Sequence, residues 1–250
     1  FLRSNRGISL TPEGKKLYEH VAIAYEQLQI GEEEIRQNGE LENGLVSIGA
    51  SENALRLVLL SRLEKFHEQY PHVRLRISNH STPQAIQALT SDIVDFAAVT
   101  TPLDIKSPLE KIPLASYREI LIGGRKYKKL AEHTQKLEDI ASLPFISLDE
   151  NSSTRELYTQ YFMRHNLPFS PDMEVATTDQ IFPMVQHNLG IGFFPEELAA
   201  EHIAQGKIVQ IPIEEPLPER KICLIRNVKR PQSIAARSLE EHLTSHRETE

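Results

Sequence analysis

The chain has 250 residues, a formal net charge of −7 and 40% hydrophobic residues, so it is long enough for one or two domains with a sizeable core. This composition excludes disordered, collagen-like and disulfide-rich classes, and the acidic balance argues against nucleic-acid binding by the bulk of the chain. Cys223 is the one cysteine, which favours a reducing, cytoplasmic compartment, and apolar runs such as Leu57–Leu60 are too short to cross a membrane.

The first ten residues are locally basic, and no signal segment opens the chain. Because the chain does not begin with methionine, we expect Phe1 to be the cut end of a longer protein. Thr11-Pro12-Glu13 is typical of a helix start, with Thr11 as the cap and Pro12 at a position that needs no N–H. The predicted helix then carries a seam spaced alternately four and three residues apart, at Leu17, Val21, Ala24, Leu28, Gly31 and Ile35.

This seam predicts a coiled-coil linker helix, roughly 26 residues and about 39 Å long, that pairs with a second copy. The alternative is an amphipathic helix packed against the rest of the chain, and Gly31 weakens the coiled coil because glycine destabilises helix interiors. Two strong turn signals follow, Asn38-Gly39 and Asn43-Gly44, and we place a domain boundary between them.

After this boundary the pattern changes to strands that alternate with helices. The predicted elements are Leu45–Ala50, Ala54–Tyr70, Val73–Ser78, Pro83–Thr90 and Phe96–Val99. A β-α-β-α-β series of this kind predicts a parallel sheet with helices on both faces.

A similar series recurs further along the chain. Its predicted elements are Pro144–Leu148, Thr154–His165, Met173–Ala176, Thr178–His187 and Ile191–Phe194. Val46 to Leu75 and Ile146 to Val175 are both 29 positions apart, so we expect the same strand-to-strand step in each half. Two such units predict a bilobal α/β fold with a cleft between the lobes. Lys111–Gly123 and Lys207–Asn227 would carry the chain across and back, and a final helix over 232–245 would pack on the first lobe.

Enzyme motifs with a defined mechanism are absent from the sequence, including phosphate loops, dinucleotide fingerprints, nucleophile elbows and zinc-ligand spacings. We therefore expect no catalytic residue, no metal and no cofactor. Cys223 lies in an apolar strand and is expected to be a core residue. In the alternative that the cleft is catalytic, Glu52 and Asp149 would serve as acid and base.

Ligands of open α/β sheets bind at the carboxyl ends of the strands. The residues at these ends are Ser51, Glu52, Asn53, Thr100, Thr101, Ser147, Asn151, Ser152, Phe193 and Phe194. Hydroxyls and free N–H groups at two helix N-termini, one in each lobe, suit a carboxylate or another small anion. The alternative is that the serines, threonines and asparagines only cap helices. As a set that faces one cleft, they predict a binding site.

Five short motifs follow one another along the whole chain. They are Phe1-x-Arg3-x-x-Arg6-Gly7-x-x-Leu10-Thr11-Pro12-Glu13-Gly14, Gly44-Leu45-Val46-Ser47-Ile48-Gly49, Tyr70-Pro71-His72-Val73, Asp95-Phe96-Ala97-Ala98-Val99 and Gly190-Ile191-Gly192-Phe193-Phe194-Pro195. In this order and with these gaps, the chain resembles a LysR-type transcriptional regulator. The resemblance runs from the end of the winged helix-turn-helix, through the linker helix, to the effector-binding domain.

The resemblance implies an effector-binding domain of the periplasmic-binding-protein type, with two Rossmann-like lobes after the long coiled-coil linker helix. It divides the chain into a remnant of the DNA-binding wing (1–10), linker helix and hinge (11–44), lobe I (45–116 and 215–250) and lobe II (117–214). It also implies a homodimer through the linker helix and commonly a homotetramer. A small-molecule effector between the lobes would change how the assembly binds promoter DNA.

The family's effector contacts correspond by position to Ser51, Asn53, Thr100 and Ser147. Arg3 and Arg6 correspond to the wing, where guanidinium groups reach phosphates or the minor groove.

The sequence also departs from the family pattern. Nearly all of the helix-turn-helix is absent, so these residues are not expected to read DNA sequence. Asp92 replaces a usual glycine, and the bulky Phe193 and Phe194 are expected to narrow the cleft or favour an aromatic or apolar part of the ligand. The alternative function is a solute-binding protein of a transport system, because the two lobes alone are compatible with it.

Overall fold

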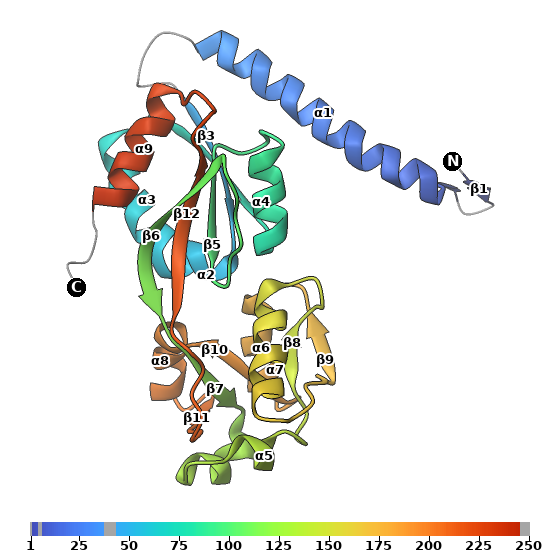
Figure 1. Ribbon diagram of the computed structural model, residues 1–250, viewed down its shortest axis with the longest axis vertical. Helices are drawn as coiled ribbons and strands as arrows, with labels where there is room; N and C mark the ends of the chain where they lie inside the picture. The colour runs from blue at the N-terminus through green and yellow to red at the C-terminus, as the bar shows by residue number, and fades with distance from the viewer. Residues whose placement is uncertain (1, 5–6, 38–43, 246–250) are drawn as a thin grey trace.

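The computed structural model describes residues 2–4, 7–37 and 44–245, and it begins with a hairpin and one long helix (Figure 1). Strands β1 (Leu2–Ser4) and β2 (Gly7–Ser9) pair antiparallel, and helix α1 spans Pro12–Gln37. The Thr11 hydroxyl accepts a hydrogen bond from the backbone N–H of Gly14 at 3.0 Å, which confirms the predicted helix start. The predicted boundary at 38–43 lies outside the described residues, as does Arg6.

Lobe I is the upper unit in Figure 1, beside α1, and it is a five-stranded sheet with helices on both faces. Its elements are β3 (Leu45–Ala50), α2 (Glu52–Ala54), the π-helical turn η2 (Leu55–Leu59), α3 (Leu60–Gln69), β4 (Arg74–Asn79), α4 (Thr82–Thr90), β5 (Phe96–Thr100), β6 (Leu109–Tyr117), β12 (Arg220–Asn227) and α9 (Ile234–Ser245). The strand order is β4-β3-β5-β12-β6, and β4, β3 and β5 are parallel as predicted. Strand β12 is antiparallel to both neighbours, so the sheet is mixed, because β12 enters it on the way back from the other lobe.

Alternate residues of the lobe I strands supply two separate cores. Phe96 and Ala98 of β5 pack with α3 and α9 on one face of the sheet, and Ala97 and Val99 pack with α4 on the other. Because both faces are covered, the strand is a continuous apolar run in the sequence. Cys223 is buried in the second core, as predicted.

Lobe II is the lower unit in Figure 1, and it is formed by one continuous stretch of chain. Its elements are β7 (Glu119–Gly123), the 3-10 helix η3 (Arg125–Glu132), α5 (Leu137–Ile140), β8 (Ile146–Leu148), α6 (Ser153–Arg164), β9 (Met173–Val175), the 3-10 helix η4 (Thr178–Gln180), α7 (Ile181–Gln186), β10 (Ile191–Pro195), α8 (Glu196–Ala204) and β11 (Val209–Ile211). Strands β10-β7-β11 form an antiparallel sheet, and a bridge between Phe145 and Ile191 joins it to the parallel pair β8-β9.

The strand-to-strand step differs between the lobes, which corrects the expectation of equal steps. In lobe I, Val46 pairs with Leu75, 29 positions on, as expected. In lobe II, Ile146 pairs with Met173, only 27 positions on, and Val175 pairs with Leu148. The crossover helix is shorter in lobe II, because α6 has 12 residues whereas the chain of lobe I is helical from 52 to 69. The longer connection between α6 and β9 offsets part of this difference.

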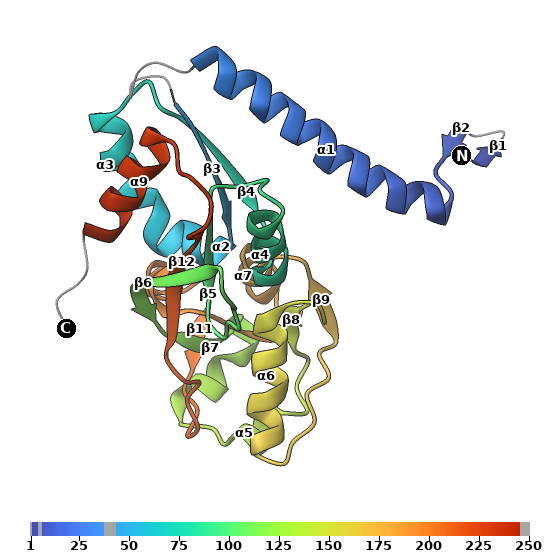
Figure 2. The same cartoon turned by 45° about the horizontal axis from the view of Figure 1, so that its top comes forward.

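Two crossovers join the lobes, and both run through the predicted segments. Strand β6 of lobe I leads through Arg118 directly into β7 of lobe II, and β11 leads back into β12. Strands β6 and β12 pair with each other along their length, so the two connections lie side by side, as Figure 1 shows. Helix α9 packs on α3 and β3 of lobe I, as predicted for the final helix (Figure 2).

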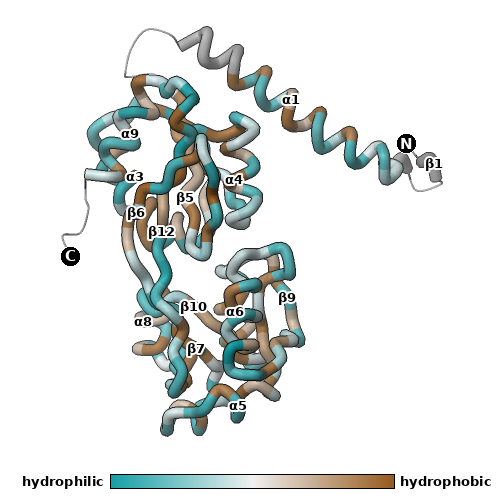
Figure 3. The backbone as a smooth tube through the Cα atoms, viewed as in Figure 1, coloured by the Kyte–Doolittle hydropathy of each residue, from teal (hydrophilic) through white to brown (hydrophobic). Residues whose placement is uncertain are grey.

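Helix α1 extends away from both lobes and leaves part of the predicted seam open to solvent (Figures 1 and 2). Leu17 is 64% exposed and Leu28 is 69% exposed, and Figure 3 shows hydrophobic positions that recur along the helix. A different side of α1 meets lobe I, where the Gln27 side-chain amide donates to the Asp92 carbonyl at 2.6 Å and Ile30 is buried. The described seam residues therefore do not pack against the rest of the chain, contrary to the alternative interpretation of this helix.

The backbone explains the two glycines of the last motif and the departure at Asp92. A Cβ atom on Gly190 would lie 2.5 Å from the Pro144 carbonyl oxygen, and one on Gly192 would lie 2.9 Å from Ile181 and 3.0 Å from the Ile146 carbonyl oxygen. These glycines therefore let β10 approach its neighbours closely. Asp92 has a φ of 57°, in the left-handed region that glycine and, less readily, aspartate adopt, so it can occupy the position of the usual glycine.

Candidate functional site

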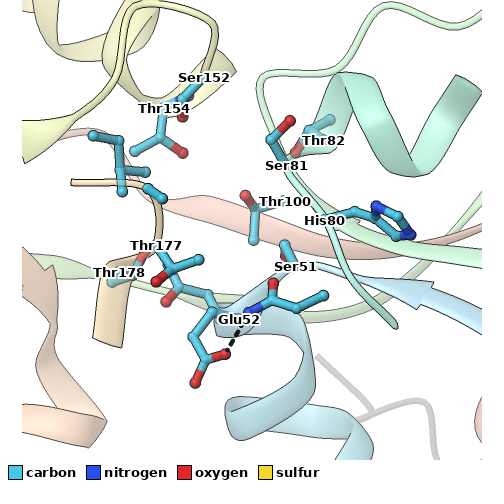
Figure 4. Close-up of a pocket in the computed structure, with 14 residues that line it drawn as sticks. Ser51, Glu52, His80, Ser81, Thr82, Thr100, Ser152, Thr154, Thr177 and Thr178 are labelled. Carbon is cyan, nitrogen blue, oxygen red and sulfur yellow. Dashed lines mark hydrogen bonds between the residues drawn. The ribbon is translucent and has the colours of Figure 1, made fainter. Parts of the chain in front are cut away.

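A pocket with an empty volume of about 420 Å³, open to solvent, lies between the two lobes (Figure 4). Lobe I lines it with Ser51, Glu52, Asn53, Asn79, His80, Ser81, Thr82 and Thr100, and lobe II lines it with Leu148, Ser152, Thr154, Ala176, Thr177 and Thr178. Eight of these fourteen residues carry a hydroxyl group, so the pocket is suited to a ligand that makes several hydrogen bonds.

Four helix N-termini converge on this pocket. Ser51 caps α2, and its hydroxyl accepts from the backbone N–H of Ala54. Ser81 caps α4 and Thr177 caps η4, in both cases as part of a capping box, and Ser152 caps α6. Free N–H groups and the positive ends of the helix dipoles favour a negative charge at such a point. The arrangement therefore favours an anionic ligand, although the same serines and threonines are also caps.

Two ionisable side chains line the pocket, and burial affects both. Burial raises the pKa of Glu52 above its ordinary value, and the negative charge of Asp179 raises it further, while Arg56 opposes the shift. The Glu52 carboxylate accepts a hydrogen bond from the side-chain amide of Asn79 at 3.2 Å. Burial lowers the pKa of His80 below its ordinary value. None of the lining residues that the structure describes is a lysine or an arginine.

An arginine nevertheless lies behind the pocket wall. Arg220, at the start of β12, is 2% exposed and spans both lobes. Its Nη2 donates to the hydroxyls of Thr100 at 2.8 Å and of Thr154 at 2.9 Å, and its Nη1 donates to the Glu119 carboxylate at 2.9 Å. Its Nε donates to the Thr101 carbonyl at 2.6 Å. One guanidinium therefore holds the end of β5, the first turn of α6 and the start of β7 together.

The structure brings together five of the residues predicted for the effector site, and these are Ser51, Glu52, Asn53, Thr100 and Ser152. Three others lie elsewhere. The hydroxyl of Thr101 accepts from the backbone N–H of Lys221, Ser147 is fully buried in β8, and Asn151 is exposed. None of these three lines the pocket.

The expectation that Phe193 and Phe194 narrow the cleft is wrong. Both side chains are 1% exposed and lie in the interior of lobe II, on opposite faces of its sheet. Phe193 packs against Tyr158 with ring centroids 4.9 Å apart, and Phe194 packs against Phe182 at 6.2 Å. Both faces of β10 are covered, so neither ring is left to face the cleft.

Sequence reasoning missed the lining residues at the carboxyl ends of β4 and β9, which are the second strands of the two β-α-β units. Asn79 ends β4 and His80 to Thr82 follow it, and Ala176 to Thr178 follow β9, so the rule on strand ends would have found both groups. Arg220 gave no such signal, because it begins a strand and stands between two charged residues.

The structure does not bring together the acid and base of the enzyme alternative. Glu52 lines the pocket, but Asp149 does not, and the carboxylate of Asp149 instead accepts from the backbone N–H of Asn151 at 2.9 Å. In the part of the chain that the structure describes, no group of histidine, cysteine and acidic side chains is arranged to hold a metal ion.

Comparison with known proteins decides the family. A family model described as the LysR substrate binding domain matches residues 39–248. The chain belongs to the LysR family. Because this match spans both lobes, the chain carries the effector-binding domain of a LysR-type transcriptional regulator. LysR regulators bind DNA and small-molecule effectors and typically form oligomers.

Similar proteins are named as transcriptional regulators in several organisms. The "Probable RuBisCO transcriptional regulator" of Trichormus variabilis is 27% identical over 253 residues, which cover 97% of this chain and 74% of that protein. The "HTH-type transcriptional regulator CzcR" of Bacillus subtilis is 25% identical over 224 residues, which cover 90% of this chain and 73% of that protein. Transcriptional regulators are not enzymes, and these relatives support the regulator interpretation rather than the transport alternative.

Solved structures show the same two-lobed, periplasmic-binding-protein-like fold as this LysR-type chain. The Synechocystis CcmR regulatory domain in complex with 2-PG superposes with a TM-score of 0.73 at 16% identity, covering 81% of this chain and 97% of that one. The effector-binding domain of QuiR in complex with shikimate gives a TM-score of 0.71 at 17% identity, covering 82% and 97%. No helix within the described ranges is both long and apolar enough to span a membrane.

Proposed function

We propose that the inter-lobe pocket binds a small anionic effector and that its occupancy modulates how the regulator binds promoter DNA. The observation that carries this proposal is the convergence of helix N-termini and hydroxyl groups from both lobes on one pocket. A ligand held by both lobes stabilises one angle between them and so couples occupancy to the shape of the assembly. The complexes of CcmR with 2-PG and of QuiR with shikimate support a small ligand in this fold.

We also propose how the chain forms an oligomer and which residues contact DNA. The exposed seam of α1, with Leu17, Val21 and Leu28, supports a homodimer through this helix, and the effector domains would complete a homotetramer. Arg3, in the β1–β2 hairpin, and Arg6 would contact DNA phosphates or the minor groove, as expected of a wing. We retain 45–116 with 215–250 and 117–214 as the proposed boundaries of the two lobes.

The direct test is footprinting of the full-length protein on its own promoter region, with and without a panel of anions that includes shikimate and 2-PG. We expect two protected half-sites whose extent or affinity changes with one anion of the panel. Absence of protection at every salt concentration would contradict the DNA-binding part of the proposal. Protection that no anion changes, together with no anion binding in calorimetry, would contradict the effector part.

Ser51→Ala and Thr100→Ala are each expected to weaken binding of the effector by about tenfold, because each removes a hydrogen bond to a charged ligand. The measurement is isothermal calorimetry with the anion that the footprint identifies. Ser233→Ala is the matched control, since the Ser233 hydroxyl also accepts from the N–H of a first helical turn, but outside the pocket. Ser51→Ala and Ser233→Ala should each lose about 1 kcal/mol of cap stability. Unchanged affinity in both pocket variants would show that the pocket is misplaced.

Binding of the anion is expected to tighten as the pH falls from 7 toward the raised pKa of Glu52. The bound negative charge raises the pKa of Glu52 further, so binding takes up protons and is favoured at lower pH. Protonation of His80 acts in the same direction, and burial lowers its pKa, so this contribution comes below the ordinary range of histidine. Calorimetry at several pH values should show a smaller pH dependence in Glu52→Gln and almost none in Glu52→Gln with His80→Asn. A pH dependence that is identical in wild type and double variant would contradict this role of the two groups.

A further inference from the structure

Two threonines in the floor of the pocket share one buried guanidinium. Thr100 belongs to lobe I and Thr154 to lobe II, and both hydroxyl oxygens accept hydrogen bonds from Nη2 of Arg220, at 2.8 and 2.9 Å. Thr100 is 3% exposed and Thr154 is 8% exposed, and both line the pocket, whereas Arg220 does not. The arginine therefore acts on the pocket only through these two side chains.

The hydrogen-bond chemistry of this group restricts the direction of the threonine hydroxyls. A guanidinium has five N–H donors and no acceptor, so a hydroxyl that accepts from it cannot donate back to it. Each threonine proton must therefore turn away from Arg220. Turned toward the pocket, the two hydroxyls become donors that match an anion or another strong acceptor and disfavour a ligand that has only donors there.

The counter-charge of Arg220 is bound by a different terminal nitrogen from the one that bonds the threonines. Nη1 bonds the carboxylate of Glu119 at 2.9 Å, and the side chain of Glu119 is 1% exposed. Nη2, which carries the threonine contacts, is the other terminal nitrogen of the same rigid fork. The buried pair therefore forms a dipole with its positive end toward the pocket floor, where a low dielectric screens it weakly.

We propose that Arg220 is a positioning residue that makes the pocket selective for anions, by orienting the hydroxyls of Thr100 and Thr154 and by placing its charge behind them. This inference rests on the proposed anion-binding function and names the group that supplies its positive charge. It explains how a pocket with no lysine or arginine among its described lining residues favours a negative ligand despite Glu52.

The test compares sulfate binding in wild type and four variants of the full chain. The probe is inorganic sulfate, titrated at constant ionic strength with chloride, and the readouts are calorimetry and the sulfate-dependent rise of the melting temperature. The variants are Arg220→Gln, Glu119→Gln, Thr154→Val and, as the matched control, Arg118→Gln. Arg118 carries the same charge on the neighbouring crossover, but its side chain is 72% exposed. The general effect of sulfate on protein surfaces is the same in this variant as in the others.

The two halves of the ion pair are expected to have opposite effects. Arg220→Gln should weaken sulfate binding about tenfold or more, because it removes the charge and frees the threonine hydroxyls to reorient. Glu119→Gln should tighten sulfate binding about threefold or more, because the charge of Arg220 is no longer neutralised. Thr154→Val should weaken binding, and Arg118→Gln should leave it unchanged. If circular dichroism shows that Arg220→Gln fails to fold, the inference is tested by the opposite effects expected on sulfate binding, weaker in Thr154→Val and tighter in Glu119→Gln.

A purely structural ion pair would give a different result, because both Arg220→Gln and Glu119→Gln would then loosen the floor and weaken binding together. That outcome, or equal affinities in all variants, would overturn the inference while leaving the proposed function intact. If the wild-type chain itself shows no sulfate binding beyond that of chloride, the proposed anion-binding function fails and this inference fails with it.

Discussion

Replacing Arg220 with methionine is expected to lower the free energy of unfolding by about 3–5 kcal/mol, because it leaves the carboxylate of Glu119 buried without its cation. The substitution also removes the donors that join Thr100 and Thr101 of lobe I to Thr154 of lobe II. The measurement is urea unfolding followed by circular dichroism, with the midpoint and the slope compared between variant and wild type.

Two controls identify the source of this loss. Arg118→Met removes an arginine from the neighbouring crossover, where its ion pair with Glu219 is 3.7 Å long and exposed, so it should change stability by about 0.5 kcal/mol or less. Adding Glu119→Leu to Arg220→Met removes the uncompensated charge and should restore most of the stability. A decrease in the free energy of unfolding of less than about 1 kcal/mol in Arg220→Met, or no recovery in the double variant, would contradict this explanation. The unpaired charge of Glu119 would then not be the cause of the lost stability.

Changing Val21 and Leu28 of α1 together to glutamate is expected to convert a homodimer into a monomer. Both side chains are exposed in the single chain, at 54% and 69%, and a dimer through this seam would bury them. Glutamate at both positions would place like charges in the apolar contact between the two helices. The free-energy cost of burying these charges would be far larger than the stabilisation that one apolar contact supplies. Sedimentation or light scattering of the chain over a range of concentrations measures the change in mass.

The matched control moves the same two charges one position along the helix. Ala22→Glu with Gln29→Glu adds glutamates at exposed positions next to the seam, so the helix should stay dimeric. A wild-type chain that is monomeric at every concentration, or a Val21→Glu and Leu28→Glu chain with the mass of the wild type, would contradict dimerisation through this face of α1.

The order of helices and strands could be predicted from the sequence because its local signals were strong. Pro71 ends a helix, Thr11 begins one, and Phe96 to Val99 form an apolar run without interruption because both faces of their sheet are covered. Strand pairing could not be predicted in the same way, because it depends on contacts between segments that are distant in the sequence. The antiparallel insertion of β12 and the shorter step of lobe II therefore appeared only in the structure.

The sequence predicted those residues of the candidate site whose place follows from the order of strands and helices. It did not predict those whose place depends on the direction of a buried side chain. Ser51 and Thr100 were found because each follows a strand of lobe I. Phe193 was misplaced because a strand covered on both faces gives no sign of which side chains reach a cleft. Arg220 was missed because a buried arginine and a solvated one look alike in a sequence when their partners lie 66 to 120 positions away.

Strand β12 determines the order in which the two lobes can fold during synthesis. Lobe II is one continuous stretch that ends with β11, whereas the lobe I sheet needs β12 between β5 and β6. Until the ribosome has made residues 220–227, β5 and β6 lack the strand that joins them, and the face that α9 covers stays open. The lobe begun first is therefore completed last, and for that interval its unpaired strand edges are exposed to chaperones and to other nascent chains.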